Sequence, residues 1–141
     1  MSYLLDTNAC IALTKGTPAG VRARLEVELA RQSEIFVSAI VAFELWYGAF
    51  KSERRASNSK GVETFLAATL GVLSFDEKDA ILAGRIRADL ALAGTPIGGY
   101  DVLIAAQAVR RELTVVTANI SEFRRVKGLK WEDWSGPARR H

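Results

Sequence analysis

Short apolar segments alternate with longer helical patterns along nearly the whole chain. The apolar segments that predict strands are residues 2–5, 34–37, 72–75, 113–117 and 129–134. Because predicted helices separate most of them, the strands are expected to run parallel, with helices on both faces of the sheet. We therefore expect an α/β protein with three layers, α/β/α, and a central, mainly parallel sheet of four to five strands. In open sheets of this kind, ligands bind beyond the carboxyl ends of the strands.

Helical spacing of apolar residues accounts for most of the remaining chain. Helices are expected at residues 9–16, 18–31, 38–50, 62–70, 77–93 and 101–112. Ser38 and Asp76 stand where N-cap side chains begin helices, and Asp76 with Asp79 resembles a capping arrangement. Residues 51–61 are polar and charged, which indicates an exposed loop or the tip of a helical hairpin. The glycine-rich residues 94–100 lack the spacing of a phosphate-binding loop and are expected to be a flexible approach to the next helix.

Length and composition indicate one domain with a core of its own. The 141 residues are 49% hydrophobic, so residues 1–141 are expected to form a single domain that ends in a flexible tail from about residue 135. No uncharged apolar run approaches the roughly 18–20 residues of a membrane helix, and the N-terminus lacks the pattern of a signal peptide. Cys10 is the only cysteine, which excludes an internal disulfide. We expect a cytoplasmic protein without membrane contact.

Histidine is almost absent from the chain. The only one is His141, the last residue. Mechanisms that need a histidine base, such as Ser-His-Asp triads and paired-histidine ribonuclease chemistry, are therefore disfavoured, as is a histidine-bound zinc site. For an enzyme of this composition, carboxylates and a hard metal ion are the natural catalytic resource.

Three acidic residues stand in unusually apolar surroundings. Asp6 follows an apolar strand, Glu44 lies inside an apolar helical segment, and Asp101 immediately precedes another. A carboxylate in such a setting needs a partner, a hydrogen-bond network or a metal ion to offset its lost hydration. Asp6 and Asn119 follow strand ends, whereas Glu44 and Asp101 fall in early helical turns, so all four side chains could border one crevice. From the residues alone, an acidic site that binds a divalent metal ion is one interpretation of this pattern.

Simpler interpretations of the same residues stay open at this point. Asp6 and Asp101 could each serve only as a helix cap, a role that stabilises by about 1 kcal/mol. Glu44 lies too far beyond Ser38 to be a cap, and its simplest alternative is burial against one arginine. Asn119 could be an ordinary turn residue.

Four blocks of sequence in order resemble the PIN domain, and more narrowly a VapC-type toxin of a bacterial toxin–antitoxin pair. They are DTN after the first strand, SAIVAFELWYG, the glycine-rich loop before DVLIAAQA, and VVTANISEF. The resemblance runs from Tyr3 to about Trp134. Asp6, Glu44 and Asp101 match the acidic positions of the family. Polar positions around that site are matched by Thr7, Asn8, Ser38 and Thr117. Asn119 stands where many PIN domains carry a fourth acid, which makes the site one negative charge weaker.

The resemblance implies an endoribonuclease that depends on Mg²⁺ or Mn²⁺ and is inhibited by a VapB-type antitoxin. It also implies a homodimer, and contact with operator DNA only through the antitoxin. From Arg110 onward, eight Lys or Arg stand against four acids, which suits a polyanionic partner. Candidates for contacts with the RNA backbone are Arg85, Arg87, Arg110, Arg124, Arg125 and Lys127. Relatives cut either transfer RNA or ribosomal RNA, and the sequence does not select between them.

Trp46, Tyr47 and Phe50 lie within about one helical turn. Three large aromatic side chains span too wide an arc of a helix to point in one direction, so some of them should reach the surface. We expect a groove there for an apolar segment of the antitoxin, which would continue to the acidic pocket, and a dimer contact through a separate apolar surface.

Three alternative functions differ from the toxin reading. The chain could be a PIN-domain nuclease of RNA processing, or a PIN-like module that binds RNA or protein without cutting. It could also be a phosphotransfer protein of the receiver or haloacid-phosphatase type, with Asp6 as the nucleophile. The last class needs a neighbouring acid and a later lysine, but the chain has DTNAC after its first strand and Thr117-Ala118-Asn119 after its fourth.

Overall fold

A five-stranded sheet forms the centre of the computed structural model, which describes residues 1–136. The strands are β1 (Ser2–Leu5), β2 (Glu34–Ser38), β3 (Gly71–Leu73), β4 (Thr114–Val116) and β5 (Lys130–Glu132). They lie in the order β3-β2-β1-β4-β5, and every neighbouring pair is parallel. The predicted fold class is therefore confirmed, with the upper of the two expected strand numbers.

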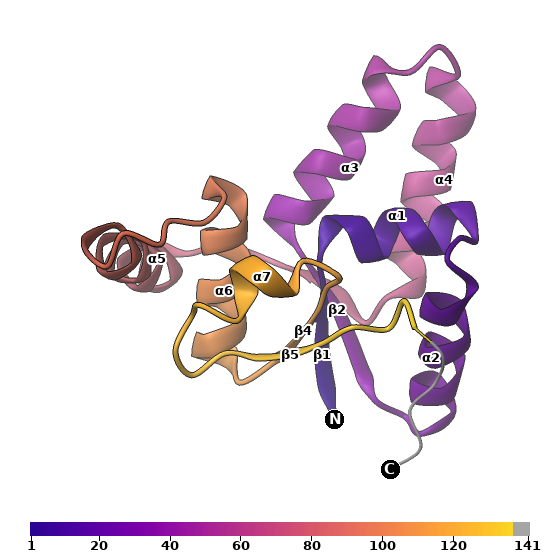
Figure 1. Cartoon of the computed structure of the whole chain (residues 1–141). Helices are drawn as coiled ribbons and strands as arrows, with labels where there is room; N and C mark the ends of the chain where they lie inside the picture. The colour runs from indigo at the N-terminus through magenta and orange to yellow at the C-terminus, as the bar shows by residue number, and fades with distance from the viewer. Residues whose placement is uncertain (137–141) are drawn as a thin grey trace.

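Seven helices within residues 1–136 cover the two faces of this sheet (Figure 1). On one face lie α1 (Thr7–Lys15), α2 (Ala19–Ala30), α3 (Ala39–Lys51) and α4 (Arg55–Ala68). On the other lie α5 (Glu77–Leu92), α6 (Gly99–Arg111) and α7 (Ile120–Phe123). The division follows from the strand order, because right-handed crossovers that proceed in opposite directions along a sheet place their helices on opposite faces. No helix in this part of the chain is both long and apolar enough to cross a membrane.

The order in which strands are added to the sheet changes direction at β1, although all the strands remain parallel. From β1 the chain moves outward to β2 and β3, then returns to the opposite side of β1 as β4. The carboxyl ends of these two strands are adjacent, since the Asp6 N–H donates to the Val116 carbonyl at 3.1 Å. A crevice at such a reversal is the usual ligand site of open parallel sheets.

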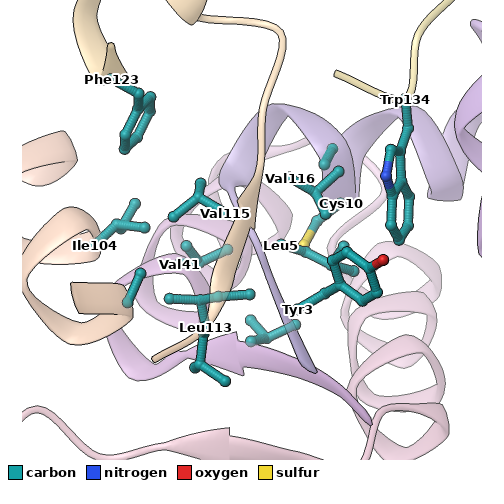
Figure 2. Close-up of a cluster of buried hydrophobic side chains, with 14 of the residues drawn as sticks. Tyr3, Leu5, Cys10, Val41, Ile104, Leu113, Val115, Val116, Phe123 and Trp134 are labelled. Atoms are coloured by element: carbon teal, nitrogen blue, oxygen red, sulfur yellow. The ribbon is translucent and has the colours of Figure 1, made fainter. Parts of the chain in front are cut away.

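The core packs against both faces of β4 (Figure 2). Because successive strand residues point to opposite faces, Val115 lies toward Ile104 and Phe123, whereas Val116 lies toward Cys10. The Tyr3 ring meets the ring of Trp134 edge to face, with centroids 5.0 Å apart. Burial on both faces explains why the central strands read as continuous apolar runs in the sequence.

Most predicted elements are present, with local differences. The polar segment 51–61 is the tip of a helical hairpin, but its turn comprises only residues 52–54 because α4 already begins at Arg55. The short helix α7 was not predicted. Asp76 and Asp79 do form a capping box at the start of α5. Residues 137–141, which include His141 and most of the expected tail, lie outside the described residues.

Candidate active site

Asp6 lies directly after β1 and begins α1. Its Oδ1 accepts a hydrogen bond of 2.8 Å from the Ala9 N–H, so the residue is indeed an N-cap. It is also nearly buried, with 4% of its surface exposed. Burial raises the pKa of Asp6 above its ordinary value, although a hydrogen bond from Thr117 opposes the shift. The negative charge of Glu44 raises it further, so Asp6 combines capping with an unfavourable electrostatic position.

Glu44 reaches the same region from α3, the helix that Ser38 begins. The Ser38 side chain is fully buried and accepts a hydrogen bond of 3.0 Å from the Ile40 N–H, as an N-cap should. Glu44 Oε1 accepts a hydrogen bond of 2.6 Å from the Thr7 hydroxyl. Burial against an arginine, the simpler interpretation of Glu44, is wrong: no ion pair in residues 1–136 includes it.

Asp101 lies in the first turn of α6, but it is not the cap of that helix. The N-cap position is Gly98, so the interpretation of Asp101 as only a cap is wrong. Asn119 Nδ2 donates to Asp101 Oδ2 at 3.1 Å and also to Glu122 Oε2. The amide therefore lies between two carboxyl groups. Burial, the adjacent Glu122 and the charge of Asp6 raise the pKa of Asp101 to about 7.

The predicted site residues meet in one cavity of about 260 Å³ at the carboxyl ends of β1 and β4. The residues that line it are Asp6, Thr7, Asn8, Glu44, Gly98, Gly99, Tyr100, Asp101 and Asn119. Ser38 and Thr117 do not line it. Ser38 instead begins α3, and Thr117 accepts a hydrogen bond of 2.9 Å from the Asn119 N–H.

Glu122 and Gly98 belong to this site, although the sequence reading gave them no role. The Gly98 N–H donates to Glu122 Oε1 at 3.0 Å, and a Cβ added at Gly98 would come within 3.3 Å of Asp101 Oδ2. Glycine therefore lets the loop approach the two carboxyl groups closely. One signal was available for Glu122, which lies one helical turn after Asn119 and supplies the acid that Asn119 lacks.

The donors around the cavity fit a hard cation chemically. Carboxylate and amide oxygens are the ligands that Mg²⁺ and Mn²⁺ prefer. A cation would also offset the burial and the repulsion that raise the pKa of Asp6 and of Asp101. Within residues 1–136, however, no three acidic side chains lie close enough together to form a ready-made ion site. Since Thr7 holds Glu44 and Asn119 holds Asp101, ion binding requires side-chain rearrangement.

The basic residues proposed for RNA contact fall into two groups. Arg110 forms ion pairs with Asp79 at 2.7 Å and with Asp76 at 3.1 Å, which gives it a structural role between α6 and the start of α5. Arg125 donates to the Pro96 carbonyl at 2.9 Å. The second group comprises Arg85, Arg87, Arg124 and Lys127, and all six residues of the set are exposed.

An aromatic groove of about 430 Å³ runs along the exposed side of α3. Its lining comprises Phe43, Trp46, Tyr47, Phe50, Lys51 and Arg55. The rings of Trp46 and Phe50 stack with centroids 5.5 Å apart, and Tyr47 is 59% exposed. Trp46, Tyr47 and Phe50 therefore reach the surface to different degrees, as expected for three large side chains that point in different directions from one helix.

Comparison with known proteins adds information on ancestry. The family model for the PIN domain matches residues 3–129. The tRNA(fMet)-specific endonuclease VapC of Salmonella typhimurium is 43% identical over 134 residues, which cover 95% of this chain and 98% of that protein. The protein of the same name from Shigella flexneri is 42% identical over 135 residues, covering 96% of this chain and 99% of that protein.

A solved structure agrees with these matches. VapBC2 from Rickettsia felis, bound to a DNA fragment from its promoter, contains a chain that superposes with a TM-score of 0.87 at 35% identity. The match covers 95% of this chain and 99% of that one.

Proposed function

This chain belongs to the VapC branch of the PIN-domain family, and we therefore propose that it cuts RNA phosphodiester bonds as the toxin of a toxin–antitoxin pair. One observation carries the proposal. Asp6, Glu44, Asp101 and Asn119 come from four separate parts of the chain and line one cavity. Burial that raises the pKa of Asp6 is unfavourable for folding alone, which supports a role for these carboxyl groups in binding a cation.

Asp6, Glu44 and Asp101 would hold an ion of Mg²⁺ or Mn²⁺. When bound, the ion lowers the pKa of a water molecule and offsets negative charge on the phosphate. Thr7 orients Glu44, and Asn119 orients Asp101 through the hydrogen bonds described above. The hydrogen bond from Asn119 to Glu122 lowers the pKa of Glu122, so Glu122 keeps its negative charge beside Asp101. Because no side chain has to become a covalent nucleophile, the mechanism needs no histidine.

Transfer RNA is the substrate class that the comparisons favour. Two relatives that align over nearly their whole length carry the name tRNA(fMet)-specific endonuclease. We propose that this chain also cuts a transfer RNA, with tRNA(fMet) as the first candidate. It would act in the cytoplasm.

Purified protein should cut tRNA(fMet) in Mg²⁺ or Mn²⁺ and should not cut it in excess EDTA. The fragments should carry a 3′-hydroxyl and a 5′-phosphate, because the ribose 2′-OH is not the attacking group. Ligation-based sequencing of 5′-phosphate ends reads both the end chemistry and the position of the cut. Ribosomal RNA in the same assay tests the substrate class.

The alternative functions give different results in that assay. A non-cutting module would bind the RNA and leave it intact with either ion. A phosphotransfer protein would form a phosphoenzyme with a small phosphodonor and would not cut RNA. A nuclease of RNA processing would also cut the RNA in this assay, and a growth test separates it, because its expression without a partner would not arrest growth.

The aromatic groove along α3 is proposed as the docking site for an apolar segment of the antitoxin. Phe43 connects the groove with the acidic cavity, since it lines the groove and contacts Tyr100 of the cavity wall. A segment in the groove could therefore continue toward the carboxyl groups and obstruct them, with a basic side chain as its end. A separate apolar surface would form a homodimer, and DNA would be contacted only through the antitoxin.

Replacing the groove aromatics should loosen the antitoxin complex. Trp46→Ala, Tyr47→Ala or Phe50→Ala should raise its dissociation constant, by roughly 30-fold for the most deeply buried contact, because aromatic anchors are worth about 2 kcal/mol or more. Titration calorimetry with the cognate antitoxin measures the change. Ile81→Ala, at a residue 68% exposed on α5, is the matched control. Unchanged affinity in all three folded variants would contradict the assignment of this groove.

A further inference from the structure

Two exposed aromatic side chains lie beside the acidic cavity and have no part in the core. Tyr100 belongs to the first turn of α6 and lines the cavity next to Asp101. Phe43 belongs to α3 and directly precedes Glu44. Their ring centroids are 6.1 Å apart and their planes are inclined by 68°, so the rings meet edge to face across two helices.

Both rings remain largely in water. Phe43 is 55% exposed and Tyr100 is 50% exposed, a cost that the fold could have avoided with polar residues at these positions. The edge-to-face contact restrains the two rings relative to each other. The pair therefore has a defined orientation and retains free ring surface.

The position of the pair favours an RNA base as its occupant. Tyr100 lines the acidic cavity, so a phosphate group held there would bring the bases of the flanking nucleotides near this ring. Unpaired RNA bases are commonly bound by stacking on aromatic side chains. Beyond Phe43, two cationic side chains line the aromatic groove, Lys51 at the end of α3 and Arg55 at the start of α4. Lys51 lies 5.6 Å from the Tyr47 ring centroid, and Arg55 lies 6.0 Å from that of Phe50. Such cations suit the phosphates of adjacent nucleotides.

We propose that Phe43 and Tyr100 form a stacking platform for an unpaired base of the RNA, next to the phosphodiester bond that is cut. This inference rests on the proposed nuclease function and names a further part of its substrate site. Stacking on a ring face tolerates every base, so the platform selects for single-stranded RNA and not for one sequence.

Binding of a short single-stranded RNA tests the platform. The full chain with Asp101→Asn keeps the RNA intact in Mg²⁺, and fluorescence anisotropy gives its affinity for a labelled RNA of about 12 nucleotides, within the usual span of single-strand sites. Adding Tyr100→Ala or Phe43→Ala should weaken binding by roughly 5- to 100-fold. Tyr100→Phe and Phe43→Tyr keep the ring and should bind within about twofold. Ile81→Ala is the control for removing an exposed apolar side chain.

A double-mutant cycle separates stacking from an indirect structural effect. An RNA that lacks the base beside the cut should bind more weakly to the unaltered platform. Tyr100→Ala should not weaken the binding of this abasic RNA further, because the two changes remove the same contact. The platform would be overturned if Tyr100→Ala weakened the binding of intact RNA and of abasic RNA equally, whichever nucleotide lacks its base. Full affinity in both alanine variants, or weakening of the antitoxin complex alone, would also overturn it.

The same experiment distinguishes the platform from the proposed function. If the unaltered chain cuts RNA in Mg²⁺ or Mn²⁺ but the alanine variants bind RNA normally, the platform alone is wrong. If the chain neither binds nor cuts RNA, the proposed function is wrong and the platform with it.

Discussion

Asp101→Asn is expected to lower RNA cleavage by roughly 100-fold or more, the scale on which loss of one electrostatic contact lowers kcat. The same change should raise the free energy of unfolding of the metal-free protein. Both effects have one cause. Burial, the adjacent Glu122 and the charge of Asp6 all disfavour the ionised form of Asp101, and a bound cation would offset that cost.

The gain in stability should depend on pH. The pKa of Asp101 is about 7 in the folded protein, against an ordinary value of 3.8. A carboxyl group with a raised folded pKa lowers the free energy of unfolding as the pH rises between these two values. The advantage of asparagine should therefore be absent below about pH 4 and complete above about pH 7. At neutral pH we expect Asp101→Asn to raise the free energy of unfolding by about 1–3 kcal/mol, after allowance for partial exposure of the site to solvent.

Urea unfolding in EDTA between pH 4 and pH 8, together with cleavage rates in Mn²⁺, measures the two effects. Asp89→Asn, at an exposed aspartate of α5, is the matched control and should change neither. Asp6→Asn should also abolish cleavage and stay folded, because asparagine is as good an N-cap as aspartate. Full activity in Asp101→Asn would mean that Asp101 has only a structural role.

Glu28→Ala is expected to lower the free energy of unfolding by about 3–5 kcal/mol, because it breaks a buried ion pair with Arg24. Glu28 lies on α2 and is fully buried. Its carboxylate accepts hydrogen bonds from Arg24 at 2.8 Å and from Ser33 at 2.9 Å. Arg24 also binds Glu132 at 2.9 Å and lies 5.5 Å from the centroid of a Trp134 ring.

This buried cluster fastens the last strand to α2. Burial raises the pKa of Glu28, but the hydrogen bonds from Arg24 and Ser33 outweigh that effect and hold the pKa below its ordinary value. Such a group stabilises the fold above its ordinary pKa and loses that contribution in acid. The difference between Glu28→Ala and the unaltered chain should accordingly shrink below about pH 4.

Thermal and urea unfolding measure the loss, and near-UV circular dichroism reports whether the Trp134 ring keeps its packing. Glu26→Ala changes an exposed glutamate of the same helix and should stay within about 0.5 kcal/mol of the unaltered chain. An equally small effect of Glu28→Ala would show that Glu132 alone satisfies Arg24.

The order of strands and helices followed from the sequence because it depends on local patterns. Apolar runs predicted the five strands, and the cap residues Ser38 and Asp76 predicted where two helices begin. The presence of Asp6 and Asn119 after strands was enough to place them at one edge of a parallel sheet. These features are encoded within a few residues of one another, where backbone geometry is decided.

The burial of individual charges depended on the tertiary structure. The apolar neighbours of Glu44 suggested deep burial, yet the fully buried acids are Glu28 and Asp79, each paired with two arginines. Glu122 likewise joined the site only because α7 packs beside α6. Sequence alone determined the order of the strands and of every helix except α7, and it identified Asp6, Glu44 and Asp101 as the candidate acids. The tertiary structure decided which charges meet, because burial and pairing are set by segments that are distant in sequence and that only packing brings together.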